Sequence, residues 1–584
     1  MKNILIAIRS IFKKGRHNVM KIVSLGIGLA VGLVLIAKVY FEQSYDDFYP
    51  DRDRVYQVWA KYQQNGGELK DYPQTSGGIA PTMQQQIPEI ETVTRYTSFG
   101  DWTFTMTDTK MKYSGRCIIA DSCFFDILPR PMLIGNAKEV LSTPMYVLIS
   151  SRIAKNIGGD VIGKNFTVDN SPGRTMTIGG VFEEVPENSH SRYDVIVSMA
   201  SAGRFMWEGS PTNMLGNDRY ISYVKLHKGV NPLALEEQVR TFVNSYFPPE
   251  EQQKVGLSID FSFHKLDNLH KELPQVKRMT WILSLLAFAL IFTAVMNYIL
   301  IVISSIVNRS KEVAVHKCYG ASENNIHGMM FGEALVHIVL SLILALLLIL
   351  AFRGTVEELL ATSLDSLLLS NGSLVLLGIC ILVFFVSGFM PGSLYARIPV
   401  ASAFRNYREN KRIWKKALLL VQFVATGFLV TMLVFVARQY TFMVNDRPGY
   451  AYENLAYCGL AGVDSTSRAK ILDEVMRLPG VAAATTVYQL PFEHASGNNI
   501  LLPGGTQELF NIADLYWVGN GYLDMMEIPV IQGRSFTENV TNSREVMVDR
   551  RFVEKMKLVA GWTDDVVGKD ICVTEHSKWN EEPF

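Results

Sequence analysis

A chain of 584 residues is too long for one hydrophobic core and is expected to form several domains. Its 56 basic and 56 acidic residues give a formal net charge of zero, so bulk electrostatics give no reason to expect a nucleic-acid partner. An apolar fraction of 48% with a mean hydropathy of +0.14 is high for a soluble protein and low for an all-membrane one, which favours transmembrane helices separated by large water-soluble domains.

Five apolar stretches are long enough to cross a bilayer, which takes about 20 helical residues. They are residues 22–41, 279–308, 334–352, 373–396 and 417–437. Buried helices of a soluble protein are the alternative, and five such runs with charges near their ends speak against it. The first stretch is long for a signal peptide and lacks a small-residue cleavage site, so we interpret it as an uncleaved anchor with Lys38 reaching toward water.

The distribution of Lys and Arg predicts the orientation of the spans, because cytoplasmic flanks are enriched in both. Residues 1–21 carry six basic residues and no acidic one, and residues 397–416 carry seven against a single glutamate. The stretch 354–373 carries three acidic residues and no basic one. We therefore expect a cytoplasmic, amphipathic N-terminus (1–21) and cytoplasmic loops at 309–333 and 397–416. The segments expected outside are two folded domains, 42–278 and 438–584, and a short turn, 353–372.

The segment 42–278 has room for a mixed α/β domain. Sequence periodicity predicts a strand at 54–62, a β-hairpin turning at Gly100-Asp101 within 92–106, and a helix at 235–247. His190 is expected in a solvated loop rather than at a metal site, because the sequence around it shows no metal-ligand spacing.

The sequence shows neither a cysteine pattern nor a motif that is typical of a catalytic site. Cys117 and Cys123 are close enough in sequence to pair in an oxidising compartment, and two reduced thiols are an equal alternative. No Ser-His-Asp, nucleophile-elbow or clustered-carboxylate pattern stands out in the sequence. We therefore predict no catalytic, cofactor-binding or metal site on this chain.

A repeated motif decides whether the chain carries a phosphate-binding loop. Gly158, Gly163 and Lys164 have the spacing of G-x-x-x-x-G-K-[ST], but Asn165 replaces the Mg²⁺-binding Ser or Thr, and strand patterns follow where a helix is required. The sequence DVIGKNFTV recurs as DVVGKDICV at 565–573 without the first glycine. We interpret both copies as tight turns entering strands. Upstream stretches recur as well, 124–128 at 522–526 and 147–157 at 546–556.

The stretch 297–341 joins the second and third spans. A short amphipathic segment with Arg309, Lys311 and Glu312 follows the second span and ends at Gly320-Ala321. Ser322 then supplies an N-cap for the helix that re-enters the membrane. A mixed-charge helix at a membrane exit is suited to act as a lever and docking surface, and an interfacial helix held by lipid headgroups is the alternative.

This stretch closely resembles the coupling loop of the FtsX-like/MacB-type ABC-transporter permeases, which runs N…R-x-K-E-[IV]-[GA]-[IV]-[RH]-K-x-x-G-A-[ST]…E. Residues at matching positions are Asn297, Arg309, Lys311, Glu312, Val313, Lys317, Gly320, Ala321, Ser322 and Glu333. Ala314 and His316 stand where the family usually has Gly and Arg. The sequence SYDDFYPDRDRVYQV at 44–58 is similar to the larger, duplicated permeases of Bacteroidota-type bacteria.

The resemblance implies an α-helical transmembrane bundle of five spans with two α/β, MacB-type periplasmic core domains, the second of them incomplete. The chain would be a non-catalytic, multi-pass permease subunit of a bacterial inner membrane. A separate cytosolic ABC ATPase would hold ATP and Mg²⁺, and its hydrolysis cycle would move the periplasmic domains to export or extract a lipid, lipoprotein, peptide or antibiotic. The implied ATPase-coupling residues are Arg309, Lys311, Glu312, Val313, Val315, His316, Lys317, Gly320, Ala321 and Ser322.

Other partners implied by the resemblance are a second permease copy or paralogue, a periplasmic adaptor or membrane-fusion protein, and membrane lipid. An FtsX-like regulatory protein that controls a cell-wall hydrolase without transport is the alternative function. Duplicated members continue with three more spans after the second outer domain. The resemblance therefore leads us to expect a truncated chain, whether as a fragment, a split gene or an incomplete sequence.

Polar residues near the membrane have more than one interpretation. Asn297 could line a pathway, although an interhelical hydrogen bond is the commoner role of such a residue. Glu333 and His337 share one helix face at the cytoplasmic edge, where we expect contact with lipid headgroups rather than a proton relay. His316, Cys318 and His327 lack zinc-ligand spacing and are expected at the surface.

Overall fold

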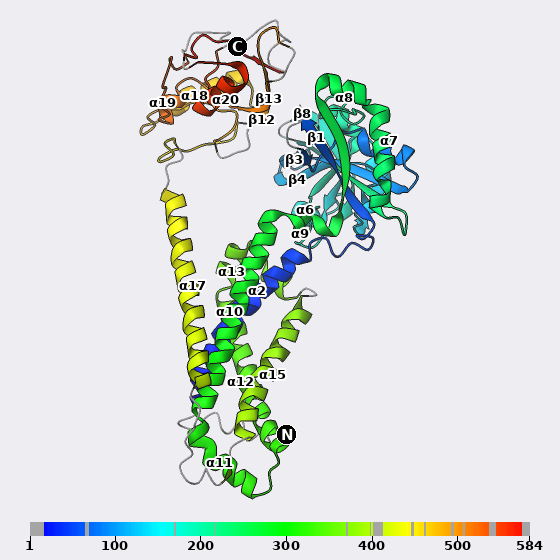
Figure 1. The fold of residues 1–584 in the computed structure, drawn as a ribbon. Helices are drawn as coiled ribbons and strands as arrows, with labels where there is room; N and C mark the ends of the chain where they lie inside the picture. The colour runs from blue at the N-terminus through cyan, green and yellow to red at the C-terminus, as the bar shows by residue number, and fades with distance from the viewer. Residues whose placement is uncertain are drawn as a thin grey trace. The chain divides into compact units, whose positions relative to one another are not determined.

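The computed structural model describes residues 17–64, 69–168, 171–216, 218–369, 372–396, 399–400, 413–445, 449–460, 463–491, 496–505, 509–536, 545–563 and 565–574. Most of the basic N-terminus and of the basic loop 397–416 lies outside these residues, as do the last ten residues of the chain. The chain forms two compact units, Met1–Phe435 and Val436–Phe584, which are taken separately here (Figure 1).

Within the described residues, five helices are long and apolar enough to cross a membrane. They are α2 (Asn18–Gln43), α10 (Pro274–Ser304), α12 (Glu323–Ala351), α15 (Ser373–Ala396) and α17 (Ile413–Asn445). Each contains most or all of one of the five apolar stretches of the sequence. The helical content of these stretches was therefore predictable from their length and hydropathy.

The helices differ in extent from the apolar stretches at three places. The second apolar stretch does not continue as one helix to residue 308, because α10 ends at Ser304 and α11 (Ile306–Cys318) follows. The third helix begins at Glu323, directly after the predicted N-cap Ser322, so its polar first turns precede the apolar stretch 334–352. The turn 353–372 contains two short helices, α13 (Arg353–Leu360) and α14 (Leu364–Leu368).

Helix α2 lies against both α10 and α12 (Figure 1). Small residues allow the close approach: a Cβ added to Gly28 would lie 2.3 Å from the Cβ of Ala294. Lys38 does not reach toward water as expected. It is 8% exposed, and its ammonium pairs with Glu42 Oε1 at 2.7 Å and donates to Thr362 Oγ1 at 2.8 Å.

The segment between α2 and α10 folds into an α/β domain, called the sheet domain below. Its eleven-stranded sheet has the order β11-β1-β10-β3-β4-β9-β6-β8-β5, with β2 added to β1, and β7 between β3 and β8. The strands are β1 (Val55–Gln64), β2 (Lys70–Tyr72), β3 (Ile90–Met106), β4 (Lys112–Ala120), β5 (Met132–Ile134), β6 (Tyr146–Ser150), β7 (Asn165–Val168), β8 (Ser171–Phe182), β9 (Val195–Ser198), β10 (Ile221–Leu226) and β11 (Leu257–Lys265).

Helices cover both faces of this sheet, so its central strands are apolar on both sides. In β4, Cys117 and Ile119 belong to one buried cluster and Ile118 to the other, as the two-residue repeat of a strand requires. The helices of the domain are α3 (Ile79–Gln86), α4 (Phe124–Ile127), α5 (Ala137–Ser142), α6 (Ser151–Ile157), α7 (Glu236–Tyr246), α8 (Pro249–Val255) and α9 (Leu269–Glu272), with the short 3₁₀ helices η1 (Met199–Arg204), η2 (Pro232–Leu235) and η3 (Leu266–Asn268).

The structure confirms the strand at 54–62 as β1 and the helix at 235–247 as α7, which buries Val239, Phe242 and Val243. The predicted hairpin at Gly100-Asp101 was wrong. Residues 90–106 form one long strand, β3, and its register against β4 shifts between Ser98 and Asp101. Gly100 has a φ of +74°, which we now assign to a bulge in a continuous strand rather than to a turn.

The second unit contains α18 (Ser465–Met476), α19 (Tyr522–Met525) and α20 (Arg550–Ala560), and a sheet of order β13-β12-β14. Its strands are β12 (Ser496–Leu501), β13 (Phe510–Leu515) and β14 (Cys572–Val573). The sequence repeats have matching local structure in the two units. Short helices α4 and α19 occupy the first pair of repeated stretches, while α6 and α20 begin at equivalent positions with side-chain caps from Ser150 and Asp549.

The two glycine-lysine motifs also have the same conformation. Gly163 has a φ of +77° and Gly568 a φ of +83°, and β7 and β14 follow them instead of helices. A phosphate-binding loop needs the N-terminus of a helix at this place. The interpretation of both motifs as turns entering strands is confirmed, and the phosphate loop is excluded.

Candidate coupling site

Helix α11 is separated from α10 and α12 by distinct breaks. It begins after Ser305, whose hydroxyl donates back to Val302 O at 2.6 Å. It ends where Gly320 adopts a φ of +84°, with Gly320 N donating to Lys317 O and Ala321 N to His316 O, both at 3.0 Å. This pair of bonds is a Schellman motif, which closes a helix at a left-handed glycine.

Helix α12 starts two residues later. Ser322 Oγ accepts a hydrogen bond from Asn325 N at 3.4 Å and so caps its first turn. The predicted stop at Gly320-Ala321 and the predicted N-cap at Ser322 are both confirmed. The reversal of the chain between α11 and α12 is therefore encoded in three consecutive residues, Gly320, Ala321 and Ser322.

The inner face of α11 is buried against the bundle. Arg309 and Ser310 are 6% and 2% exposed, and Val313 and Ala314 one turn later are each 1% exposed. Two positions repeated every four residues face the same side of a helix. The buried residues therefore form one stripe that packs on the spans.

The outer face of α11 is open to solvent. Val315 is 43% and Tyr319 is 88% exposed, and Lys311 and His316 are exposed beside them. The outer face thus carries a cation, an imidazole and two apolar side chains. A surface of this mixed character is suited to contact another protein.

Arg309 ties α11 to two spans through a buried charge cluster. Its Nη1 lies 2.8 Å from Glu333 Oε2 on α12, and Lys21 Nζ on α2 lies 3.5 Å from Glu333 Oε1. Glu333 is 6% and Lys21 is 1% exposed. The expected contact of Glu333 with lipid headgroups is therefore wrong, because two cations from other helices enclose its carboxylate.

A third span, α15, contacts α11 through residues in the last turn of α15. The guanidinium of Arg309 lies over the ring of Tyr395 at 5.5 Å, and the Tyr395 hydroxyl contacts Ser305 Oγ at 3.1 Å. Lys317 Nζ donates to Ala396 O at 2.7 Å. A displacement of α11 would thus act on α2, α12 and α15 together.

The predicted coupling residues therefore fall into two groups. The bundle holds Arg309, Val313 and Lys317, while Lys311, Val315, His316, Gly320 and Ser322 are exposed, and Glu312 and Ala321 are half-buried. The sequence analysis missed Lys21, Tyr319 and Tyr395. An aromatic residue directly before the helix-ending glycine was a usable signal for Tyr319, whereas Lys21 and Tyr395 are distant in sequence from α11.

Asn297 and His337 lie deeper in the bundle. His337 is 1% exposed and its Nδ1 contacts the Tyr298 hydroxyl at 3.1 Å, so it is not at a headgroup-level surface either. Asn297 is half-buried, and the side-chain hydrogen bonds of the described residues do not include the expected interhelical one from it. The contact between Tyr298 and His337 joins α10 to α12.

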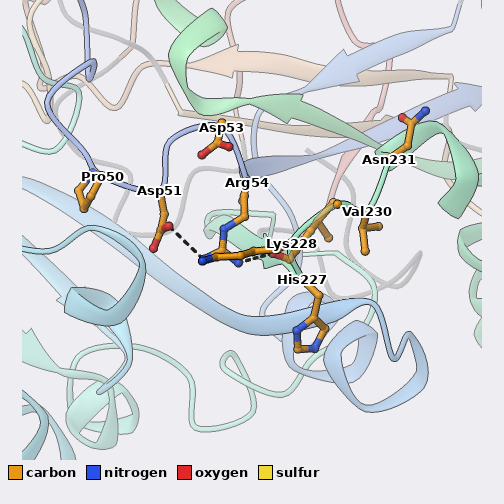
Figure 2. A pocket seen from close by; sticks show the side chains of 10 residues that line it. Pro50, Asp51, Asp53, Arg54, His227, Lys228, Val230 and Asn231 are labelled. Carbon is orange, nitrogen blue, oxygen red and sulfur yellow. Dashed lines mark hydrogen bonds and ion pairs between the residues drawn. The ribbon is translucent and has the colours of Figure 1, made fainter.

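A hollow of about 610 Å³ lies on the sheet domain (Figure 2). Figure 2 shows Arg54 reaching toward Asp51, and Arg54 also pairs with Glu91 at 2.6 Å. Hydrogen bonds from Lys225 and Arg54 lower the pKa of Asp51, and the bond from Arg54 lowers the pKa of Glu91. Asp51, Arg54, Glu91 and Lys225 thus form a network of ion pairs at the edge of the hollow.

The described residues contain no cluster of three or more His, Cys, Asp or Glu side chains that could hold a metal ion. All six cysteines are free thiols, including Cys117 and Cys123, so the structure takes the reduced alternative. Burial raises the pKa of the Cys117 thiol, which disfavours its thiolate.

Two family models match the chain. The model of the MacB-like periplasmic core domain matches residues 20–242, and that of the FtsX-like permease C-terminal region matches residues 284–400. Together they cover more than half of the chain, from α2 to the end of α15. No curated protein matches it.

Three solved structures are similar to part of this chain. A domain of a putative permease protein from Porphyromonas gingivalis is 33% identical, with 37% of this chain and 91% of that one covered and a TM-score of 0.35. The periplasmic region of MacB from Actinobacillus actinomycetemcomitans is 16% identical, with coverages of 37% and 91% and a TM-score of 0.25. The extracellular domain of the noncanonic ABC-type transporter YknZ from Gram-positive bacteria is 11% identical, with coverages of 35% and 98% and a TM-score of 0.26.

Proposed function

This chain belongs to the FtsX-like/MacB-type permeases of ABC transporters, and from that premise we propose that α11 is the docking element for a separate cytosolic ATPase. The two-faced geometry of α11 supports the proposal most directly. Its outer face, with Lys311, Val315 and Tyr319, is free to contact a partner, while its inner face is tied to three spans. A partner that closes and opens would therefore pull on the bundle through Arg309.

In this proposal the chain is a non-catalytic subunit, and the partner holds ATP and Mg²⁺. Hydrolysis in the partner would shift α11 and, through the bundle, the sheet domain, so that work is delivered across the membrane without a pore through the subunit. The cargo would be a lipid, lipoprotein, peptide or antibiotic. The sheet domain and the second unit would lie on the periplasmic side of a bacterial inner membrane, with α11 in the cytoplasm.

Assembly with further partners belongs to the same proposal. A second permease copy or paralogue would complete the membrane part, since the apolar side chains of α17 are exposed along its length. A periplasmic adaptor and membrane lipid would complete the surroundings. We also propose the second unit as a second core domain, supported by the matching helices α6 and α20 and the matching turns at Gly163 and Gly568.

The test is co-purification of the cognate ATPase with the full chain. Val315→Asp places a charge on the outer face of α11 and is expected to abolish binding of the ATPase while leaving the melting temperature of the chain unchanged. Leu133→Asp is the matched control, because Leu133 is an exposed apolar residue on the sheet domain, at 55% against 43% for Val315. Normal ATPase binding by Val315→Asp, or equal loss in both variants, would reject α11 as the docking element.

A further inference from the structure

The sheet domain meets the helical bundle at a buried polar joint, called the neck below. The neck consists of residues 44–49 after α2, the segment 187–191 between β8 and β9, His270 on α9, and the last turns of α2. The joint brings together parts of the chain that are more than 140 residues apart in sequence. It lies at the opposite end of α2 from Lys21.

Nearly every residue of segment 187–191 forms a hydrogen bond or ion pair with another part of the neck or the bundle. Asn188 donates from Nδ2 to Ser44 O at 2.6 Å and accepts at its own carbonyl from Asp46 N at 2.9 Å. Ser189 Oγ donates to Asp46 Oδ1 at 2.6 Å, and His190 Nδ1 contacts Asp46 Oδ2 at 2.6 Å. His190 lies in a loop, as expected, but its side chain is only 30% exposed because Asp46 holds its ring.

The remaining residues of this segment, Glu187 and Ser191, add further hydrogen bonds. Glu187 Oε2 accepts from Ser363 N, between α13 and α14, at 3.0 Å. Ser191 accepts at its carbonyl from the buried guanidinium of Arg130, and its hydroxyl contacts that of Tyr49 at 2.8 Å. The segment thus connects the sheet core, the exit of α2 and the α13–α14 corner.

A second histidine–carboxylate contact lies beside the first. His270 Nε2 is 2.5 Å from Glu42 Oε2 on the last turn of α2, and the other oxygen of Glu42 holds Lys38. The ring of Tyr45 stacks on His270 with a centroid distance of 3.7 Å and meets His190 edge-on at 5.0 Å. The two imidazoles also meet each other edge-on at 5.4 Å, so the three rings form one cluster.

Burial makes this joint resistant to bending. Asp46 is 0% and Glu42 is 6% exposed, so separating either carboxylate from its partners would leave a charge in a poorly solvated place. Asp46 also has a φ of +56°, a left-handed conformation that is uncommon for residues other than glycine. A hinge requires residues that can change φ and ψ freely, and the neck offers none at Asp46.

We propose that the neck is a rigid connection rather than a hinge. In this proposal Asp46 and Glu42 are the positioning residues that fix the sheet domain to α2. This inference rests on the proposed function only for what moves α2. Because α2 carries Lys21 of the coupling cluster at one end and Glu42 of the neck at the other, a displacement of α2 reaches the sheet domain undiminished. The helix is 26 residues, or about 39 Å, long.

The test measures the distance between two spin labels on the full chain in lipid nanodiscs, without any partner. The labels replace Lys138 on α5 and Trp281 on α10, both exposed, in a chain whose other reactive cysteines are changed to serine. The unmodified neck is expected to give one narrow distance distribution. The double variant Asp46→Asn, Glu42→Gln is expected to give a broad distribution with more than one maximum.

Asp47→Asn is the matched control, because Asp47 carries the same charge one residue further but pairs with Arg52 and Lys271 at the surface. In the native chain, Asn188 Nδ2 lies 3.1 Å from Ser44 Oγ. A disulfide between Ser44→Cys and Asn188→Cys is therefore expected to narrow the distance distribution of the double variant again. That rescue separates loss of the joint from general unfolding.

Two outcomes would overturn the proposal: a distribution in the double variant as narrow as that of the unmodified chain, or a broad one that the disulfide fails to narrow. Because the ATPase is absent from the experiment, failure of α11 to bind an ATPase would not change its result. The proposal that the neck is rigid and the proposal that α11 docks an ATPase can therefore fail independently.

Discussion

The carboxylate of Glu333 lies between two cations that come from different helices, Lys21 on α2 and Arg309 on α11. All three side chains are nearly inaccessible to solvent. In such a cluster each charge depends on the others, because an uncompensated charge in a poorly solvated interior is costly. The cluster therefore both fastens α11 and makes that fastening sensitive to a single substitution.

Glu333→Gln is expected to destabilise the chain, because it removes the buried carboxylate that Lys21 and Arg309 share and leaves Arg309 only Glu312, at 3.6 Å. Breaking a buried ion pair in this way costs about 3–5 kcal/mol. The measurement is the thermal unfolding of the purified chain in detergent, which should show a clear fall in melting temperature.

Glu323→Gln serves as the control for this substitution, since Glu323 is exposed in the first turn of the same helix. Its loss should cost only about 0.3–1 kcal/mol through the helix dipole. Equal melting temperatures for the two variants would mean that the buried cluster does not hold the helices together.

At the scale of elements, the junction between α11 and α12 is set by backbone conformation rather than by packing. A Cβ added at Gly320 would meet no atom within 4 Å, so space does not explain the glycine. Its φ of +84° explains the glycine, because residues with a Cβ disfavour the left-handed region. The direction in which α11 leaves the bundle thus depends on one residue.

Gly320→Ala is expected to strain this junction by about 1–2 kcal/mol and to weaken ATPase binding by misdirecting α11. Gly354→Ala is a matched comparison, because Gly354 also has open space around it but lies within helix α13 with a negative φ. The ATPase affinity of both variants is measured by titration of the purified chain. Identical affinities would show that the glycine conformation does not orient the docking face.

At the scale of the whole molecule, the proposed function places α11 and the second unit on opposite sides of the membrane. Two native thiols report on this arrangement. Cys318 ends α11 and Cys458 lies in the second unit, and both are exposed and free. The assignment can therefore be tested without introducing new cysteines.

A membrane-impermeant maleimide applied to intact spheroplasts is expected to modify Cys458 and to leave Cys318 unmodified until the membrane is permeabilised. The variants Cys318→Ser and Cys458→Ser identify which thiol carries the label on a mass-shift gel. Modification of Cys318 in intact spheroplasts would contradict the proposed orientation, and with it the access of a cytosolic ATPase to α11.

The sequence alone determined those features of this protein that depend on neighbouring residues. Length and hydropathy identified five apolar helices, alternation identified β1, and the residues from Gly320 to Ser322 predicted the reversal between α11 and α12. The strand after Lys164 excluded a phosphate loop. Each of these rests on hydrogen bonds or periodicities within a few residues, which a local pattern records.

The tertiary structure decided what depends on residues far apart in the chain. Gly100 was predicted to turn a hairpin, but pairing with β4 keeps β3 continuous and makes the glycine a bulge. Lys38 and Glu333 were expected to contact water or headgroups, and helices distant in sequence supply their partners instead. A buried charge must be matched wherever the fold brings a partner, so its surroundings follow from packing and not from its neighbours in sequence.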